Sequence, residues 1–220
     1  MNKGFDTDFI REKQRQLWVN DDMPMLIIVF IAIYFFVSYI VPSYLLTPVN
    51  ILGSSMQPTL LEGDRVILYM QGDIDYGNIV VIYAPDVYNN DTGSYGEDII
   101  KRVMGLPGDT VCFKKEEGKY VFHRTSVVNG MTVETVLRDE FYVAKNNTLS
   151  EDQIDTVFKI GVTYTLKEDE YFVLGDNRLY SLDSRSESVG LVKREQIIGK
   201  ALFLVREGKT YIFDNDVFVK

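Results

Sequence analysis

Two adjacent serines, Ser54 and Ser55, stand in the polar stretch GSSMQPTLLEGDRV (53–66), shortly after a long apolar run. A serine hydroxyl is a poor nucleophile until a neighbouring group takes its proton. His123, in YVFHRTS, is the only histidine of the chain, and we interpret it as a structural or surface residue. The base would then be a carboxylate or a lysine, and a lysine accepts a proton only where apolar surroundings lower its pKa.

Lys101 meets this requirement for a base. It lies in DIIKRVMG, where the period of a strand puts Ile99 and Val103 on its own face and Ile100 and Met104 on the other. A lysine on the mostly apolar face of a buried strand is costly unless it has a partner or a role. Considered alone, Lys101 is more typical of a strand lysine that extends its amine to solvent.

A third polar segment, GDNRLYSLDSR (175–185), has the composition of a tight turn with many side-chain-to-backbone hydrogen bonds. In such a turn Ser181 could bond the lysine amine and fix its direction. Asp183 and Arg185 could form an ion pair that braces the turn. A turn with a purely structural role is the alternative.

The composition excludes several other kinds of site. A net charge of −9 argues against a nucleic-acid partner, which requires a basic face. Cys112 is the only cysteine, so the chain cannot form an internal disulfide or a cysteine-rich zinc site, and we expect this thiol to be packed in the core. With a single histidine, a multi-histidine metal site is impossible as well. We expect no metal ion and no other cofactor.

The apolar run precedes these segments and predicts a membrane anchor at residues 25–46. Its length of about 22 residues is enough to cross a hydrocarbon core of ~30 Å. The run is longer than the apolar region of a cleaved signal peptide, and no A-x-A-like site follows it. A buried core helix is the alternative. No later stretch is comparable, so we expect a single span.

The basic residues on either side of the run predict its orientation. Lys3, Arg11, Lys13 and Arg15 precede it, whereas the next basic residue is Arg65. By the positive-inside rule, the tail 1–24 stays in the cytoplasm and the domain 47–220 lies outside, in a single-pass protein of the cell membrane.

The exported domain is predicted to be mainly β, with antiparallel strands in a folded sheet or an irregular barrel. Short runs rich in Val, Ile, Tyr and Phe alternate with turn residues, and long amphipathic helices are missing. Two polar insertions, 86–97 and 144–168, are expected to be surface loops, although the second contains apolar residues that could pack. The candidate strands are 65–70, 78–84, 98–104, 109–114, 119–124, 132–138, 170–176, 200–206 and 209–214.

The serine stretch, the Lys101 strand and the turn 175–185, in this order after an N-terminal anchor, resemble the motifs of the bacterial type I signal peptidases. In that family the motifs read roughly SMxPT, a GDRV-like strand, KRVxGxPGD and GDNxxxSxDSR. The single span and the modest length are similar to the Gram-positive branch. Here the motifs occupy residues 55–59, 63–66, 101–109 and 175–185.

The resemblance implies a serine endopeptidase with a Ser-Lys dyad. Ser55, rather than Ser54, would be the nucleophile, and Lys101 would be the general base that later protonates the leaving amine. The backbone N–H of Ser55 would belong to the oxyanion hole. Some family members have a serine hydroxyl two positions before the nucleophile as a second donor, but here that position is Gly53, so the second donor is open.

The resemblance also implies supporting residues and a substrate. Ser181 would orient the lysine and Asp183 would pair with Arg185, while Asp176 and Asn177 belong to the same motif. The substrate would be the signal peptide of an exported precursor, bound at the lipid surface as an added strand and cut after a small residue. The alternative function is a catalytically inactive, membrane-anchored assembly factor with the same fold. A penicillin-binding type of serine–lysine enzyme is excluded, because S-x-x-K does not occur.

Overall fold

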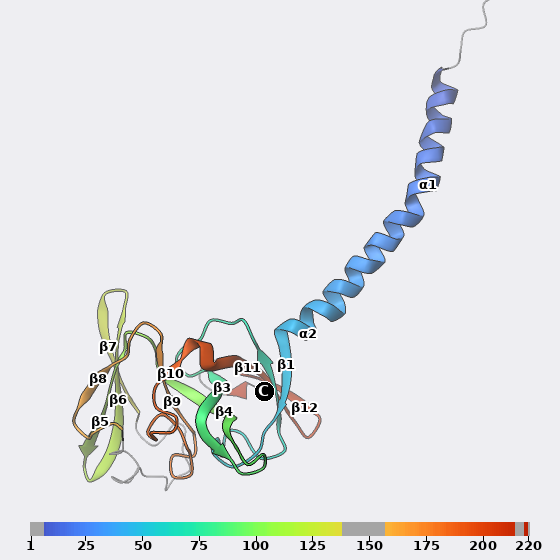
Figure 1. Cartoon of the computed structure of the whole chain (residues 1–220). Helices are drawn as coiled ribbons and strands as arrows, with labels where there is room; N and C mark the ends of the chain where they lie inside the picture. The colour runs from blue at the N-terminus through green and yellow to red at the C-terminus, as the bar shows by residue number, and fades with distance from the viewer. Residues whose placement is uncertain (1–6, 138–156, 214–217, 220) are drawn as a thin grey trace, which may run out of the picture. The chain divides into compact units, whose positions relative to one another are not determined.

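The computed structural model describes residues 7–137, 157–213 and 218–219, and the chain divides into two compact units (Figure 1). The first unit, Met1–Leu45, is helical in its described part, and the second, Leu46–Lys220, is built from strands.

The helical unit contains one segment that is long and apolar enough to cross a membrane. Met23–Leu45 has a mean hydropathy of 2.6 over its most apolar window, and it differs from the predicted span 25–46 by only one or two residues at each end. Branched and aromatic side chains cover the whole circumference of this segment, which is typical of a helix surrounded by lipid. The helical elements are α1 (Thr7–Phe35), the π-helical turn η1 (Phe36–Ile40) and α2 (Val41–Leu45).

The second unit has a large antiparallel sheet with the strand order β1-β2-β11-β3-β4-β9-β10. β12 pairs with β11, and β13 pairs with β12. The prediction of a mainly antiparallel β domain is confirmed. The strands are β1 (Leu46–Asn50), β2 (Arg65–Tyr69), β3 (Ile79–Asn89), β4 (Ser94–Gly105), β9 (Glu170–Leu174), β10 (Val192–Lys193), β11 (Ile197–Arg206), β12 (Lys209–Phe213) and β13 (Phe218–Val219).

A smaller antiparallel sheet has the order β7-β6-β5-β8 and stands to the left in Figure 1. Its core joins Phe113 and Phe122 to Phe172 of the large sheet, with the rings of Phe122 and Phe172 stacked at a centroid distance of 5.2 Å. The two sheets therefore share one hydrophobic cluster. The strands are β5 (Thr110–Glu116), β6 (Lys119–Val128), β7 (Met131–Leu137) and β8 (Thr163–Thr165), and a short 3-10 helix, η2 (Arg194–Gln196), precedes β11.

β4 is the strand on which the rest of the site depends. Met104 packs into the cluster shared with the small sheet, Ile100 into a cluster with β1 and β2, and Val103 into a third cluster with β3 and β9. Because three separate clusters hold this strand, its position and its register are strongly fixed.

Two segments differ from the sequence prediction. Leu46, predicted as the last residue of the span, and residues 47–50, for which no strand was predicted, form β1 at the edge of the sheet. Pro48 is tolerated there because an edge strand has unpaired positions. Residues 86–97, expected to be a surface loop, extend β3 and β4 into a hairpin in which Tyr88 pairs with Tyr95. The polar turn residues were predicted correctly only at the hairpin tip.

The second predicted loop, 144–168, is partly packed. Phe158 and Leu166 are buried in the cluster that the two sheets share, and β8 lies between them. Residues 144–156 of this prediction lie outside the described residues.

Candidate active site

Ser55 lies in the loop between β1 and β2, which is closed at its base and anchored in the core. The Ile51 N–H donates to Asp64 O at 2.8 Å, so the two ends of the loop are joined. Met56 and Leu60 are fully buried, and they hold the loop on the sheet. This anchoring leaves Ser55 half-buried beside Lys101 of β4.

Lys101 extends from β4 to this serine. Its amine donates to Ser55 Oγ at 3.0 Å and to the carbonyl of Ile100 at 2.7 Å, and the residue is 3% exposed. Burial lowers the pKa of the amine from its ordinary value of 10.5 to about 8, although the charges of Asp183 and Glu97 act in the opposite direction. A neutral amine, the form that can accept a proton, is therefore accessible near neutral pH.

The neighbouring Ser54 lies differently. It is exposed, and Lys101 Nζ donates to Ser55 Oγ, not to Ser54. Its carbonyl accepts a hydrogen bond from Asn177 Nδ2 at 3.0 Å. Of the two serines, Ser55 alone is therefore placed next to a buried amine.

The turn after β9 fixes the backbone of both serines. The Asn177 N–H donates to Ser55 O at 2.9 Å, in addition to the side-chain bond to Ser54 O. Gly175, just before it, lies so close to Ser181 and to Ser55 O that a side chain there would collide with both. The sequence indicated a hydrogen-bonded turn but not that the turn holds the serine loop.

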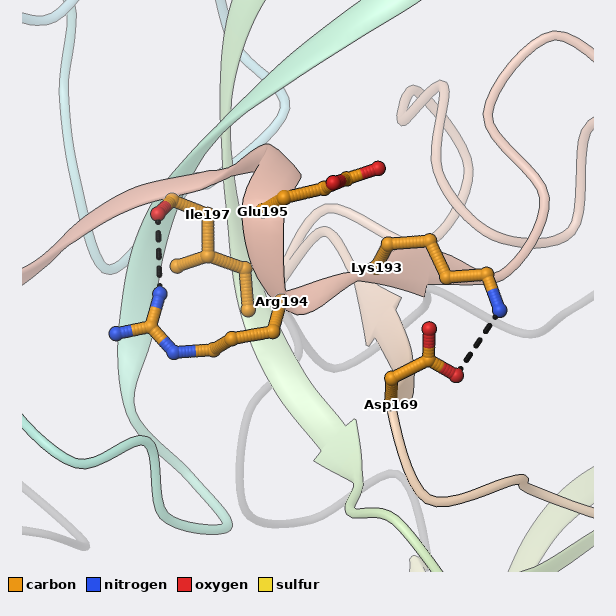
Figure 2. A pocket seen from close by; sticks show the side chains of 5 residues that line it. All are labelled: Asp169, Lys193, Arg194, Glu195 and Ile197. Carbon is orange, nitrogen blue, oxygen red and sulfur yellow. Dashed lines mark hydrogen bonds and ion pairs between the residues drawn. The ribbon is translucent and has the colours of Figure 1, made fainter.

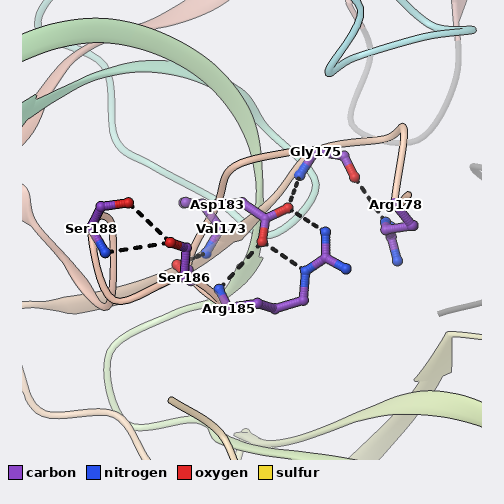
Figure 3. A network of polar contacts seen from close by, with 8 residues as sticks. Val173, Gly175, Arg178, Asp183, Arg185, Ser186 and Ser188 are labelled. Carbon is purple, nitrogen blue, oxygen red and sulfur yellow. Dashed lines mark hydrogen bonds and ion pairs between the residues drawn. The ribbon is translucent and has the colours of Figure 1, made fainter. Parts of the chain in front are cut away.

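Asp183 and Arg185 form a buried ion pair below this turn (Figure 3). Arg185 donates from Nε and Nη2 to the two carboxylate oxygens at 2.8 Å, and the Gly175 N–H donates to Asp183 Oδ2 at 3.0 Å. Burial alone would raise the pKa of Asp183, but Arg185, the Gly175 N–H and the nearby Ser181 hydroxyl outweigh it, so the pKa is lowered. The carboxylate is therefore negative at neutral pH and braces the turn.

Ser181 is placed near the site but differs from the expectation. The Lys101 amine donates to Ser55 Oγ and to a carbonyl, and no bond from it to Ser181 is formed among the described residues. Ser181 Oγ is buried, and within the described part of the chain it has no hydrogen bond of good geometry. Its packing against Gly175, rather than a bond to the lysine, is what the structure contains.

A second buried ion pair, between Arg102 and Asp176, was not predicted. Arg102 donates from Nε and Nη2 to the Asp176 carboxylate at 2.8 and 2.6 Å and from Nη1 to Gly77 O at 2.8 Å. Since Lys101 and Arg102 are adjacent in a strand, they point to opposite faces. The sequence did contain a signal for this pair, namely two consecutive basic residues on a buried strand. Only one of them can face the serine, so the other needs an acidic partner on the opposite face.

Arg178 is a further buried side chain that sequence reasoning missed. Its Nε donates to Gly175 O at 2.9 Å, as Figure 3 shows, and burial lowers the pKa of its guanidinium. This bond holds the carbonyl of the glycine whose N–H is bound by Asp183. Both polar groups of Gly175 are thus fixed by buried charged side chains.

A groove of about 420 Å³ leads to the serine and the lysine. Apolar side chains of β1 to β4 form much of its wall, and Glu97, Tyr180 and Leu182 also contribute. Asp98 and Lys101 line it as well, and its mainly apolar wall suits an extended peptide with apolar side chains. Its lining includes Val49, Ile51, Leu52, Leu68, Val81, Val87, Ile99, Ile100 and Ile198.

A second hollow, of about 520 Å³, lies among charged side chains near η2 (Figure 2). Lys193 donates to Asp169 at 3.1 Å and Arg194 to Ile197 O at 3.2 Å, so both of its basic side chains already have partners. Neither the serine nor the lysine described above contributes to it.

No arrangement suited to a metal ion occurs in the part of the chain that the structure describes. His123 lies on β6 of the small sheet, where its two ring nitrogens contact Glu134 at 3.0 Å and Glu116 at 2.9 Å. The histidine is buried in this cluster and is not part of the serine site.

Comparison with known proteins gives a consistent result. The chain matches the profile of the family described as "Signal peptidase, peptidase S26" over residues 24–206. It is 34% identical over 188 residues to signal peptidase IB of Staphylococcus aureus, covering 80% of this chain and 86% of that protein. It is 32% identical over 179 residues to signal peptidase I S of Bacillus subtilis, covering 79% and 84%.

A solved structure of a signal peptidase I from Enterococcus faecalis is 25% identical to this chain, with a TM-score of 0.37. The match covers 59% of this chain and 97% of the solved one. The family match extends over most of the chain and includes the serine loop, β4 and the turn after β9. The chain therefore belongs to the signal peptidases of peptidase family S26, serine endopeptidases that remove signal peptides from secreted precursors.

Proposed function

We propose that Ser55 and Lys101 form the catalytic dyad of this signal peptidase. The observation that carries the proposal is the 3.0 Å contact between Lys101 Nζ and Ser55 Oγ, made by a buried amine whose pKa is about 8. A serine alone is not nucleophilic, and a charged lysine cannot take its proton, so both the contact and the lowered pKa are needed.

The chemistry then follows in two stages. Neutral Lys101 takes the proton of Ser55 while Oγ attacks the carbonyl carbon of the small residue at −1, and the backbone N–H of Ser55 stabilises the oxyanion. The protonated amine next gives its proton to the leaving amine, which frees the mature protein and leaves an ester on Ser55. Water, deprotonated by the same lysine, hydrolyses that ester and releases the signal peptide.

The buried ion pairs have a positioning role in this proposal. Asp183 accepts from the Gly175 N–H, and the Asn177 N–H of the same turn donates to Ser55 O. The ion pair between Asp183 and Arg185 therefore fixes the position of the serine backbone through this turn. Ser181 fills the space beside Gly175 and supports the same turn from within. Asp176 ties this turn to β4 through Arg102, on the face opposite the lysine.

The substrate is proposed to be a signal peptide bound as an extended strand in the groove. Small residues at −1 and −3 fit the shallow apolar wall. We further propose that Met23–Leu45 anchors the protein in the cell membrane with residues 1–24 in the cytoplasm and the domain 47–220 outside, because the basic residues before the span favour that orientation. The site would then face translocated precursors at the outer lipid surface, with no metal or nucleic acid involved.

The function is tested with the full-length protein in detergent and an authentic exported precursor. We expect the wild type to trim the precursor once, after a small residue, with the new N-terminus identified by mass spectrometry. The Ser54→Ala variant is expected to retain activity within a few-fold, because Ser54 is exposed and does not bond the amine. Several authentic precursors left intact by the wild type would instead support an inactive assembly factor.

The pH dependence of cleavage is expected to follow the protonation of Lys101. Since the amine must be neutral, kcat/KM should fall about tenfold per pH unit below an apparent pKa near 8. Glu97 raises the pKa of this amine, so Glu97→Gln should move the acid limb of the profile to lower pH. The measurement is kcat/KM on a peptide substrate across pH, with the exposed Glu187→Gln as control. An unmoved midpoint in Glu97→Gln would contradict this coupling.

A further inference from the structure

The β6–β7 hairpin ends in a tip that carries no charge over residues 125–133. Asn129 and Gly130 form its two-residue turn, and both have positive φ, 53° and 76°, as a tight hairpin turn of the primed type requires. Around the turn, Val127 is 71% exposed and Met131 is 67% exposed. Such side chains are unusual at a hairpin tip in water, because nothing in the described chain covers them.

The exposed apolar side chains lie on both faces of the tip. Val128 pairs with Met131, and Ser126 pairs with Val133, so these residues share one face, whereas Val127 lies on the other. A protein surface that docks on the hairpin would cover only one face. A surrounding apolar medium covers both.

The opposite end of β6 is different in character. The turn between β5 and β6 has the sequence EEGK (116–119), with three charged residues in four. One end of the small sheet is therefore charged and the other apolar, although both are tight turns of similar exposure. This polarity indicates that the two ends meet different surroundings.

The membrane is the apolar medium that is always within reach of this tip. Leu46, the first residue of β1, directly follows the apolar segment Met23–Leu45. In Figure 1 the turn of the β6–β7 hairpin and the beginning of β1 both lie at the upper edge of the 46–220 unit. A tether of this kind gives the tip a high effective concentration at the lipid surface, so even a small apolar contact is populated.

We propose that the tip of the β6–β7 hairpin enters the interfacial region of the bilayer that holds the anchor, as a second membrane contact of the peptidase domain. The proposal rests on the membrane anchoring proposed above, but not on the assignment of the dyad. Two contacts at separate points of the domain fix its tilt, and with it the height of the groove above the lipid.

Tryptophan fluorescence in full-length protein tests this placement. Trp18, the only tryptophan, is changed to Phe, and single tryptophans are introduced as Met131→Trp and Val127→Trp on the two faces of the tip. Lys119→Trp, at the charged end of β6, is the matched control. Each protein is reconstituted in phosphatidylcholine–phosphatidylglycerol vesicles, with and without lipids brominated near the headgroup end of the acyl chain.

We expect the bromolipids to quench both tip tryptophans about two-fold more than Lys119→Trp, with a blue-shifted emission. Quenching no greater than that of the control would overturn the proposal, and so would quenching on one face alone, which indicates docking on a protein surface. A blue shift that depends on protein concentration without quenching would assign the tip to contact with a second copy, and would overturn it too.

A functional readout separates this inference from the proposed reaction. The double change Val128→Ser and Met131→Ser should reduce cleavage of a precursor embedded in vesicles several-fold, while cleavage of a soluble peptide in detergent stays at the wild-type level. Val162→Ser, at another exposed apolar position of the same region, is the control and should change neither. If the double variant cleaves the embedded precursor as well as the control does, the lipid contact has no part in cleavage at the membrane and the proposal fails. If the wild type does not cleave the soluble peptide in detergent, that result counts against the proposed function alone.

Discussion

Replacement of Lys101 by methionine is expected to abolish precursor cleavage and, at pH 7, to increase the free energy of unfolding. Methionine has a similar length but no proton acceptor, so Ser55 loses its base. The wild-type protein buries an amine that is still mostly protonated at pH 7, and this burial opposes folding. The difference between 10.5 and about 8 corresponds to a cost on the order of 3 kcal/mol, which the methionine does not carry.

The pH dependence of stability provides the internal check on this prediction. Below pH 8 both the folded and the unfolded chain hold the Lys101 proton, so the full cost is present. Between pH 8 and 10.5 the unfolded chain holds more protons than the folded one, so wild-type stability is expected to rise with pH in this window. The Lys101→Met variant should lack that rise.

Chemical denaturation of full-length protein at pH 7 and 9.5, beside a cleavage assay, measures both effects. Ser55→Ala is the matched control, because it should also abolish cleavage but keeps the buried amine and hence the pH dependence. If Lys101→Met proved several kcal/mol less stable than wild type at pH 7, the amine would be a net stabilising group, and the account of its lowered pKa would be wrong.

Gly175→Ala is expected to reduce kcat by roughly 10²-fold, the effect of moving a reacting group by about 1 Å. The new Cβ would collide with the Ser181 side chain and would lie 2.6 Å from the backbone oxygen of Ser55. Rotation of the Ser181 side chain would move Oγ but leave its Cβ 2.4 Å from the new atom, so the turn has to shift. Because Ser55 O is held by the Asn177 N–H of that turn, the serine loop has to shift as well. Overpacking of this kind also costs about 1–3 kcal/mol of stability.

Removal of the Ser181 side chain separates the two collisions. In Gly175→Ala/Ser181→Gly the contact with Ser181 is absent, whereas the contact with Ser55 O remains. Relative to Gly175→Ala, we therefore expect the double variant to regain much of the lost stability but little of the lost kcat. Ser181→Gly alone completes the double-mutant cycle and gives the effect of removing this side chain by itself. Full recovery of kcat would place the limiting contact at Ser181 and exclude a displacement of Ser55.

The sequence predicted the elements of the site better than the contacts between them. Alternating apolar residues bounded by turn residues were enough to predict the strands, because the two-residue alternation of side chains in a strand reflects only which face is buried. Ser55 and Lys101 were chosen by residue type and by their motifs, and the structure brings their side chains into contact. The pair between Arg102 and Asp176 was not, because it joins positions that are 74 residues apart, and such a contact depends on which strands are neighbours.

The errors of the sequence prediction have similar physical causes. Polar residues at 86–97 indicated a loop, but backbone pairing between β3 and β4 overrides weak local preference and continues the hairpin. Leu46 was assigned to the end of the span and no strand was predicted at 47–50, because one apolar residue has the same character in lipid and in an edge strand and LTPVN contains too few strand-forming residues. The position of Ser181 follows from packing against Gly175, which a pattern of residue types does not contain.

The opposite directions of Lys101 and Arg102 on β4 also bear on when the protein becomes a protease. If β4 paired one residue out of register, Arg102 would face the serine in place of Lys101. A guanidinium remains charged at every physiological pH and cannot take a proton, so that form would be inert. With the dyad proposed above, proteolytic activity therefore requires the final strand pairing of β4.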